Sequence, residues 1–160
     1  MPEPAAKPPL ILAVDTATEM ASLALSDGVQ MLAEVTWRTR RDHSSSLLGE
    51  IQRALASQGR SIADVTVLGV ACGPGSFTGV RVGLSVVKGL AFALSLPAFG
   101  FSTLQILASS VPAATLPVRT VVAAGRGRVV TALFRGGKQV EQPFLCSADA
   151  LPSLAHEPTI

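Results

Sequence analysis

The sequence contains few of the residues that build metal or redox sites: two cysteines and two histidines among 160 residues. Cys72 and Cys146 have neither the spacing of metal ligands nor the density of a disulfide scaffold, so we expect buried free thiols in a reducing compartment. His43 and His156 lie far apart and form no His-x-x-x-His pair, which argues against a catalytic zinc or iron site. The sequence therefore predicts no catalytic zinc or iron site.

Charged side chains are also scarce, at 15% of the chain against 48% hydrophobic residues, and the formal net charge is +2. With so few charged side chains, part of the protein surface is expected to be buried against a partner. A net charge as small as this does not identify a nucleic-acid-binding protein. The apolar stretch at residues 82–96 contains Lys88 and is followed by Pro97, short of the ~20 residues that a membrane span requires. We therefore expect a soluble, cytoplasmic protein with no membrane partner. The proline-rich residues 1–9 are expected to form a disordered leader that is not a secretory signal.

The periodicity of apolar residues predicts an α/β fold. Strands are expected at 10–14, 21–26 and 29–37, with a hairpin turn at Asp27-Gly28. A helix at 43–58 ended by Gly59, a strand at 65–71, a helix at 77–94, a strand at 97–100 and a helix from 102 through 107 follow. Residues 10–112 thus make a first lobe of βββαβα order. Strands at 118–124, 129–134 and 139–145 repeat the opening of that order, so residues 113–160 are expected to form a partial, truncated second lobe.

The most informative segment is the glycine-rich turn GPGSFTGVRVG at residues 73–83, which runs into the apolar helix. Its serine, Ser76, lacks the Gly-x-Ser-x-Gly setting of a nucleophile elbow and is predicted to cap the helix, so no catalytic residue is expected. Gly75, Gly79 and Gly83 recur every fourth residue and would let another backbone approach one side of the helix. Because a helix that is apolar all round must be covered on all sides, we predict a partner interface here.

The predicted partner interface is formed by this helix and by the amphipathic helix before it. We expect Val80→Glu or Gly83→Leu to break the association and to leave the lobe folded. The interface is expected to contain His43, Leu47, Ile51, Gly75, Phe77, Gly79, Val80, Gly83, Leu84 and Val87.

Four local motifs together resemble one protein family. They are ILAVDTATE at residues 11–19, His43 after the third strand, GPGSFTGVR at residues 73–81 and GFSTL at residues 100–104. Two successive lobes of βββαβα type are the plan of the actin, Hsp70 and sugar-kinase superfamily, whose lobes have a ribonuclease H-like motif. Within that plan the motifs resemble the bacterial TsaB family, also called YeaZ, over roughly residues 10–135.

The resemblance implies a role in tRNA modification without chemistry of its own. Members of this family are similar in fold to TsaD, the catalytic subunit that makes N6-threonylcarbamoyladenosine (t6A) in tRNA. The family implies a non-catalytic scaffold that forms homodimers, pairs with TsaD through the same helical surface and recruits TsaE, so that tRNA is reached indirectly through the complex. Family members carry an aspartate near the start of the second lobe, where this chain has AAGRGR at residues 123–128, and they are some tens of residues longer.

Two alternatives to the scaffold remain open. Asp15, Thr16 and Thr18 stand where the superfamily places groups around magnesium and phosphate, so a phosphotransferase or ATPase that binds ATP or ADP with Mg²⁺ is one alternative. The same side chains could simply satisfy turn amides, in which case no cofactor is required. An M22-type peptidase is the other, less favoured alternative. Two basic regions could contact tRNA phosphates or lie on solvated loops. The first is Arg38, Arg40, Arg41 and His43, and the second is Arg119, Arg126, Arg128, Arg135 and Lys138.

Overall fold

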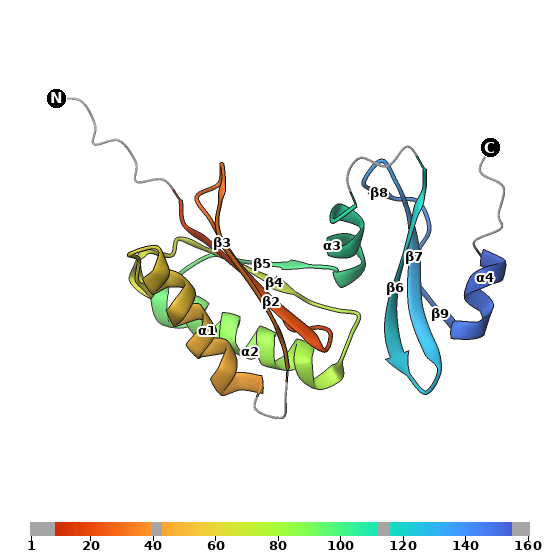
Figure 1. The fold of residues 1–160 in the computed structure, drawn as a ribbon, viewed down its shortest axis with the longest axis horizontal. Coiled ribbons are helices and arrows are strands. Elements are labelled where there is room, and N and C mark those ends of the chain that lie inside the picture. The colour runs from red at the N-terminus through yellow and green to blue at the C-terminus, as the bar shows by residue number, and fades with distance from the viewer. Residues whose placement is uncertain (1–8, 40–42, 112–115, 155–160) are drawn as a thin grey trace.

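A computed structural model describes residues 9–39, 43–111 and 116–154, and the side chains of residues 43–46 are outside that description. The predicted leader therefore lies outside the described residues, apart from Pro9, as do Arg40, Arg41 and His156. The described chain forms two β-sheets, each with its own apolar cluster, which follow one another along the long axis of the molecule (Figure 1).

The first sheet has five strands in the order β3-β2-β1-β4-β5. They are β1 (Ile11–Asp15), β2 (Met20–Ser26), β3 (Met31–Arg38), β4 (Val67–Ala71) and β5 (Ala98–Phe101). β2 pairs antiparallel with β1 and β3, while β4 pairs parallel with β1 and β5. Alternation along these strands sends Leu12, Val14, Leu23 and Leu25 to one face, where all four are buried.

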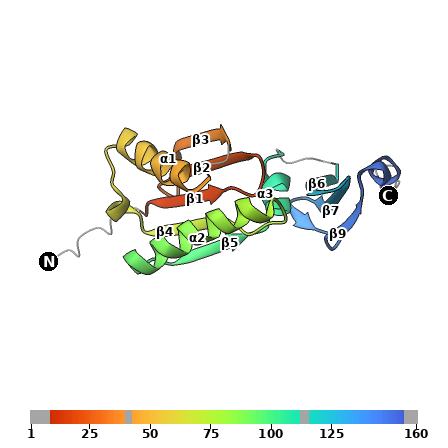
Figure 2. The same cartoon turned by 90° about the horizontal axis from the view of Figure 1, so that it is seen from below.

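Two helices cover that buried face, as Figure 2 shows. The helix α1 (His43–Ser57) ends at Gly59, which has φ +61°, and the Arg60 amide donates to the Leu55 carbonyl, so Gly59 ends the helix as predicted. The helix α2 (Phe77–Leu94) begins after Ser76, whose hydroxyl accepts from the Gly79 amide at 3.2 Å, so the predicted cap is confirmed. The predicted βββαβα order is therefore confirmed through α2.

The second sheet holds β6 (Val118–Gly125), β7 (Arg128–Arg135), β8 (Lys138–Gln139) and β9 (Phe144–Ser147). The helix α3 (Thr103–Ser109) packs on β6, and its Leu104 joins Val122 and Phe134 in a second apolar cluster. The described residues also include two 3₁₀ turns, Ile62–Asp64 and Ala148–Ala150, and a short helix α4 (Leu151–Leu154).

The prediction of one continuous strand at 139–145 is wrong. β8 and β9 both pair with β7, and the residues between them leave the ladder. The Val140 and Glu141 amides both donate to the same Leu133 carbonyl, and Pro143 has no amide hydrogen to donate. The strand therefore breaks at these residues and resumes at Phe144.

Candidate partner interface and phosphate loop

The loop between β1 and β2 carries the three residues predicted to hold a nucleotide. The Asp15 carboxylate accepts from the Ala17 amide at 2.8 Å. The Thr18 hydroxyl accepts from the Met20 amide at 3.2 Å and donates to the Met20 carbonyl at 2.8 Å. The Thr16 hydroxyl is buried and donates to the Gly79 carbonyl of α2 at 2.7 Å. Each of the three side chains thus has a structural hydrogen bond, which favours the turn interpretation, while nucleotide binding stays a prediction.

The Asp15 carboxyl is half-buried, and this burial raises its pKa above the ordinary value of 3.8, against the smaller lowering effect of the Ala17 amide. A raised pKa in the folded state adds stability that is complete below 3.8 and is lost as pH rises through the folded pKa. We expect Asp15→Asn, which keeps an oxygen acceptor for Ala17, to be at least as stable as wild type near neutral pH. Thermal unfolding at about pH 4 and about pH 7 should show that the melting temperature of the wild type rises relative to that of the variant as pH falls. A difference in melting temperature that stays constant with pH would contradict this.

The hydroxyl of Thr16 ties the β1–β2 loop to α2. We expect Thr16→Val, which keeps the side-chain shape and removes the hydroxyl, to lower the free energy of unfolding by about 1 kcal/mol, the net value of one hydrogen bond. Thr18→Val is the matched control, because the hydroxyl of Thr18 bonds only within its own exposed turn. Urea unfolding measures both variants. An equal loss of stability in the two would show that the buried hydrogen bond of Thr16 contributes no more than the exposed hydrogen bonds of Thr18.

The glycines of the turn face this same loop. A Cβ atom on Gly75 would overlap the Ala17 carbonyl, one on Gly79 would overlap the Thr16 carbonyl, and one on Gly83 would overlap the Thr16 hydroxyl. The Ser76 amide donates to the Ala17 carbonyl at 2.7 Å, which draws the turn against the loop. The prediction that these glycines receive a partner's helix is therefore corrected: they admit the close approach of a loop of the same chain.

Three other predicted interface residues also lie inside the chain. Leu47 is 0% exposed, Ile51 2% and Val87 1%, and all three belong to the cluster between the helices and the first sheet. This too is a correction, because their apolar side chains are covered by their own sheet. Val80 and Leu84 are half-buried, and the side chain of His43 is outside the described residues.

The outer side of α2 remains uncovered by the described residues. Phe77 is 70% exposed and Phe92 is 91% exposed. The Arg81 guanidinium lies 3.6 Å above the centre of the Phe77 ring, a cation–π contact at the surface. A hollow of about 390 Å³ opens beside them, lined by Phe77, Thr78, Arg81, Val82, Ser85 and Val86. The sequence prediction omitted Arg81 and Phe92, although their spacing of four and fifteen residues from Phe77 places them on one side of the helix.

Within the described residues, α2 is the one helix whose length and apolar composition would suffice to cross a membrane, with a mean hydropathy of 1.5 and 17% of its residues buried. Core helices of soluble proteins pass the same test. Its Gly79 and Gly83 face the β1–β2 loop, and its Val87 packs in the cluster on the first sheet.

Known proteins resemble this chain in both sequence and structure. A family model described as "TsaD: tRNA N6-adenosine threonylcarbamoyltransferase" matches residues 30–150. The chain is 44% identical over 100 residues to the tRNA threonylcarbamoyladenosine biosynthesis protein TsaB of Escherichia coli, a match of 61% of this chain and 42% of that protein. It is 31% identical over 150 residues to an uncharacterized protein of Mycobacterium tuberculosis, covering 91% of this chain and 70% of the other. The structure of YeaZ from Pseudomonas aeruginosa superposes with a TM-score of 0.73 at 29% identity, over 87% of this chain and 67% of that one.

The sheet order, the covering helices and these neighbours define an α/β protein of the actin-like, ribonuclease H-like class. The chain belongs to the TsaB (YeaZ) family, whose curated members are named for tRNA threonylcarbamoyladenosine biosynthesis. It spans 42% of the length of the E. coli relative.

Proposed function

We propose that this chain is a non-catalytic subunit of tRNA t6A biosynthesis that acts by binding the threonylcarbamoyltransferase TsaD through the outer side of α2. In the absence of TsaD the same surface forms a homodimer. TsaE joins the assembly as a further protein, and tRNA is reached through the complex. The site of action is the cytoplasm, and no cofactor is required.

The observation that carries this proposal is the exposure of two phenylalanines on the outer side of α2, Phe77 at 70% and Phe92 at 91%. The other side of the helix is accounted for within the chain, because its apolar residues pack against the first cluster; they include Val82, Leu84, Val86, Leu90 and Ala91. Exposed apolar surface of this kind, flanked by polar residues, is typical of protein interaction sites. Phe77 and Arg81 are of residue types enriched at interfaces, and arginine is common among the residues that contribute most to binding.

The proposed surface differs from the one predicted from sequence. It contains Phe77, Arg81 and Phe92, and it leaves out the glycines and the side chains that the sheet covers. The helices α1 and α2 contact each other and Leu48 of α1 is exposed, so we extend the proposed surface to Leu48. A helix pair presented by a homologous chain would fit such a surface.

The comparisons support the proposed role in tRNA t6A biosynthesis. The E. coli relative is named as a biosynthesis protein, and the matching family model describes the transferase itself. Among the described residues no group of three or more His, Cys, Asp or Glu side chains is placed to hold a metal ion.

The deciding experiment has two parts. Tagged chain should co-purify with the TsaD of its own organism at a fixed stoichiometry. Expression of the chain should then restore t6A in tRNA, measured by nucleoside mass spectrometry, in a strain lacking its TsaB. If neither complex nor t6A appears, the proposal fails; complex without t6A would retain the binding role and remove the scaffold role.

Nucleotide binding is tested separately, by titrating ATP with Mg²⁺ into the purified chain. Micromolar binding that Asp15→Ala abolishes, together with turnover in the absence of partners, would favour the phosphotransferase alternative. Because Asp15, Thr16 and Thr18 are hydrogen-bonded within their own turn and to α2, we expect no such binding.

A further inference from the structure

The outer side of α2 carries a stripe of exposed side chains in a symmetric order. At about 100° per residue, five of them fall within roughly 80° of the helix circumference, on the side opposite the buried Gly83. We call these five residues the outer stripe. They are Phe77, Arg81, Ser85, Lys88 and Phe92.

The outer stripe has nearly the same order of side chains in both directions. Phe77 and Phe92 stand at its ends, and Arg81 and Lys88 stand between them. The midpoint of the two phenylalanines along the chain coincides with the midpoint of the two cations. At about 1.5 Å per residue, the phenylalanines are about 22 Å apart along the axis and the cations about 10 Å. A helix packed antiparallel and centred on that midpoint therefore meets both pairs in register.

Both charges on the outer stripe are positive. α2 contains no aspartate or glutamate, and neither Arg81 nor Lys88 forms an ion pair with another described residue. A second copy that packs on the stripe about a two-fold axis at its midpoint would place Arg81 of each copy at the level of Lys88 of the other. Four cations would then share one surface without a carboxylate from either α2, which weakens the homodimer.

We propose that Arg81 and Lys88 select the partner of α2. The partner they fit is an antiparallel helix with two carboxylates seven residues apart and an apolar residue four positions outside each carboxylate. The carboxylates pair with the two cations, and the apolar side chains pack on Phe77 and Phe92. The hollow of about 390 Å³ beside Phe77 and Arg81 leaves room for one of these apolar side chains.

This inference rests on the proposed function, because it takes the outer side of α2 as the interface. It adds a reason why a different protein is preferred there to a second copy of the chain. The cations attract an acidic helix and repel their own counterparts, and specificity is the difference between these two affinities.

The test uses the full chain and its double variant Arg81→Glu/Lys88→Glu, which places carboxylates at the two cation positions. Sedimentation velocity with one of the two chains fluorescently labelled measures the mixed dimer and each homodimer. At about 50 mM NaCl we expect the mixed dimer to be at least about tenfold tighter than either homodimer, because each glutamate lies opposite a cation. At about 500 mM NaCl screening should reduce this preference to about threefold or less.

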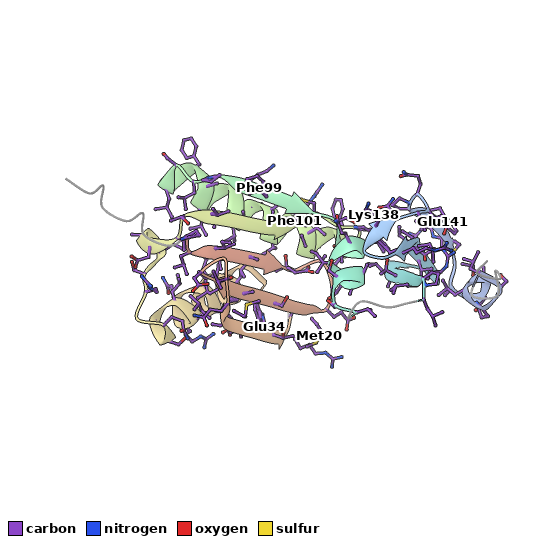
Figure 3. All side chains as sticks on the ribbon, turned by 90° about the horizontal axis from the view of Figure 1, so that it is seen from above. Met20, Glu34, Phe99, Phe101, Lys138 and Glu141 are labelled. Atoms are coloured by element: carbon purple, nitrogen blue, oxygen red, sulfur yellow. The ribbon has the colours of Figure 1, made fainter. Side chains whose placement is uncertain are left out.

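The matched control is the double variant Arg135→Glu/Lys138→Glu. It changes the net charge by the same amount on the second sheet, where the two residues are paired and where Figure 3 shows Lys138. This variant should associate with wild type as tightly as wild type does with itself. The Arg81→Glu/Lys88→Glu variant should also bind TsaD at least about tenfold more weakly, whereas the control should bind it unchanged. Far-ultraviolet circular dichroism checks that both variants are folded.

Three results would overturn the proposal: a mixed dimer that is absent or no tighter than the wild-type homodimer, an equal preference in the control, or TsaD binding that Arg81→Glu/Lys88→Glu does not weaken. After any of these results the proposed function still stands where Phe77→Glu disrupts association. Association that neither Phe77→Glu nor Arg81→Glu/Lys88→Glu changes would instead remove α2 as the interface, and both proposals would fail.

Discussion

Gly79→Ala is expected to lower the free energy of unfolding by about 3 kcal/mol, the upper part of the usual range for overpacking. The added Cβ would overlap the carbonyl oxygen of Thr16, which is backbone and cannot rotate away. The Thr16 hydroxyl bonds to the carbonyl of the same glycine at 2.7 Å, so the loop cannot retreat without losing that bond. Chemical denaturation of the full chain measures the loss.

Gly89→Ala is the matched control, because Gly89 lies on the same helix with nothing within 4 Å of its added Cβ. That change should raise stability by about 1 kcal/mol through helix propensity alone. The two variants therefore shift stability in opposite directions. If both stabilise the chain, the contact between α2 and the β1–β2 loop is not as described. For the same reason Gly83→Leu should unfold the lobe, in contrast to the prediction from sequence that the lobe would stay folded.

Phe77→Glu should weaken association through α2 by about 30-fold or more, the effect of losing an interface residue that contributes at least about 2 kcal/mol. The side chain is 70% exposed, so the fold tolerates the change, and the Arg81 guanidinium would move from the aromatic ring to the new carboxylate. Sedimentation velocity measures the homodimer, and titration with TsaD measures the heterodimer.

The control for Phe77→Glu is Val29→Glu, an equally large apolar-to-charged change at a residue that is 95% exposed in the turn between β2 and β3. It should leave both associations unchanged. Phe92→Glu, at the far end of α2, tests whether the interface includes that end of the helix. Equal effects of Phe77→Glu and Val29→Glu on association would show that the interface does not lie on α2.

Much of the fold follows from local signals. The bounds of α2 coincide with the predicted range, because Ser76 caps its start and the apolar run continues to its end. α1 ends within one residue of its prediction, at a glycine with positive φ. The break in the strand after β8 escaped prediction because pairing with β7 is a long-range property that the local residue pattern does not encode.

The candidate interface was harder to predict for a related reason. Spacing shows which residues of a helix share a side, but it does not show what covers that side. Thr16 lies 63 residues before Gly79, so nothing near the glycines indicates that a loop of the same chain fills the strip. A helix that packs on a sheet of its own chain and a helix that packs on a partner show the same apolar periodicity. For this reason Leu47, Ile51 and Val87 were assigned to a partner interface, although the first sheet covers them.

The two apolar clusters of the described chain have no residue in common, and each is built on its own sheet. Trp37, the one tryptophan of the sequence, packs against the first cluster. Its emission therefore follows the melting of the first cluster alone, whereas far-ultraviolet circular dichroism sums the signals of both sheets. On heating, the dichroism should fall in two steps, and fluorescence should follow only one of them.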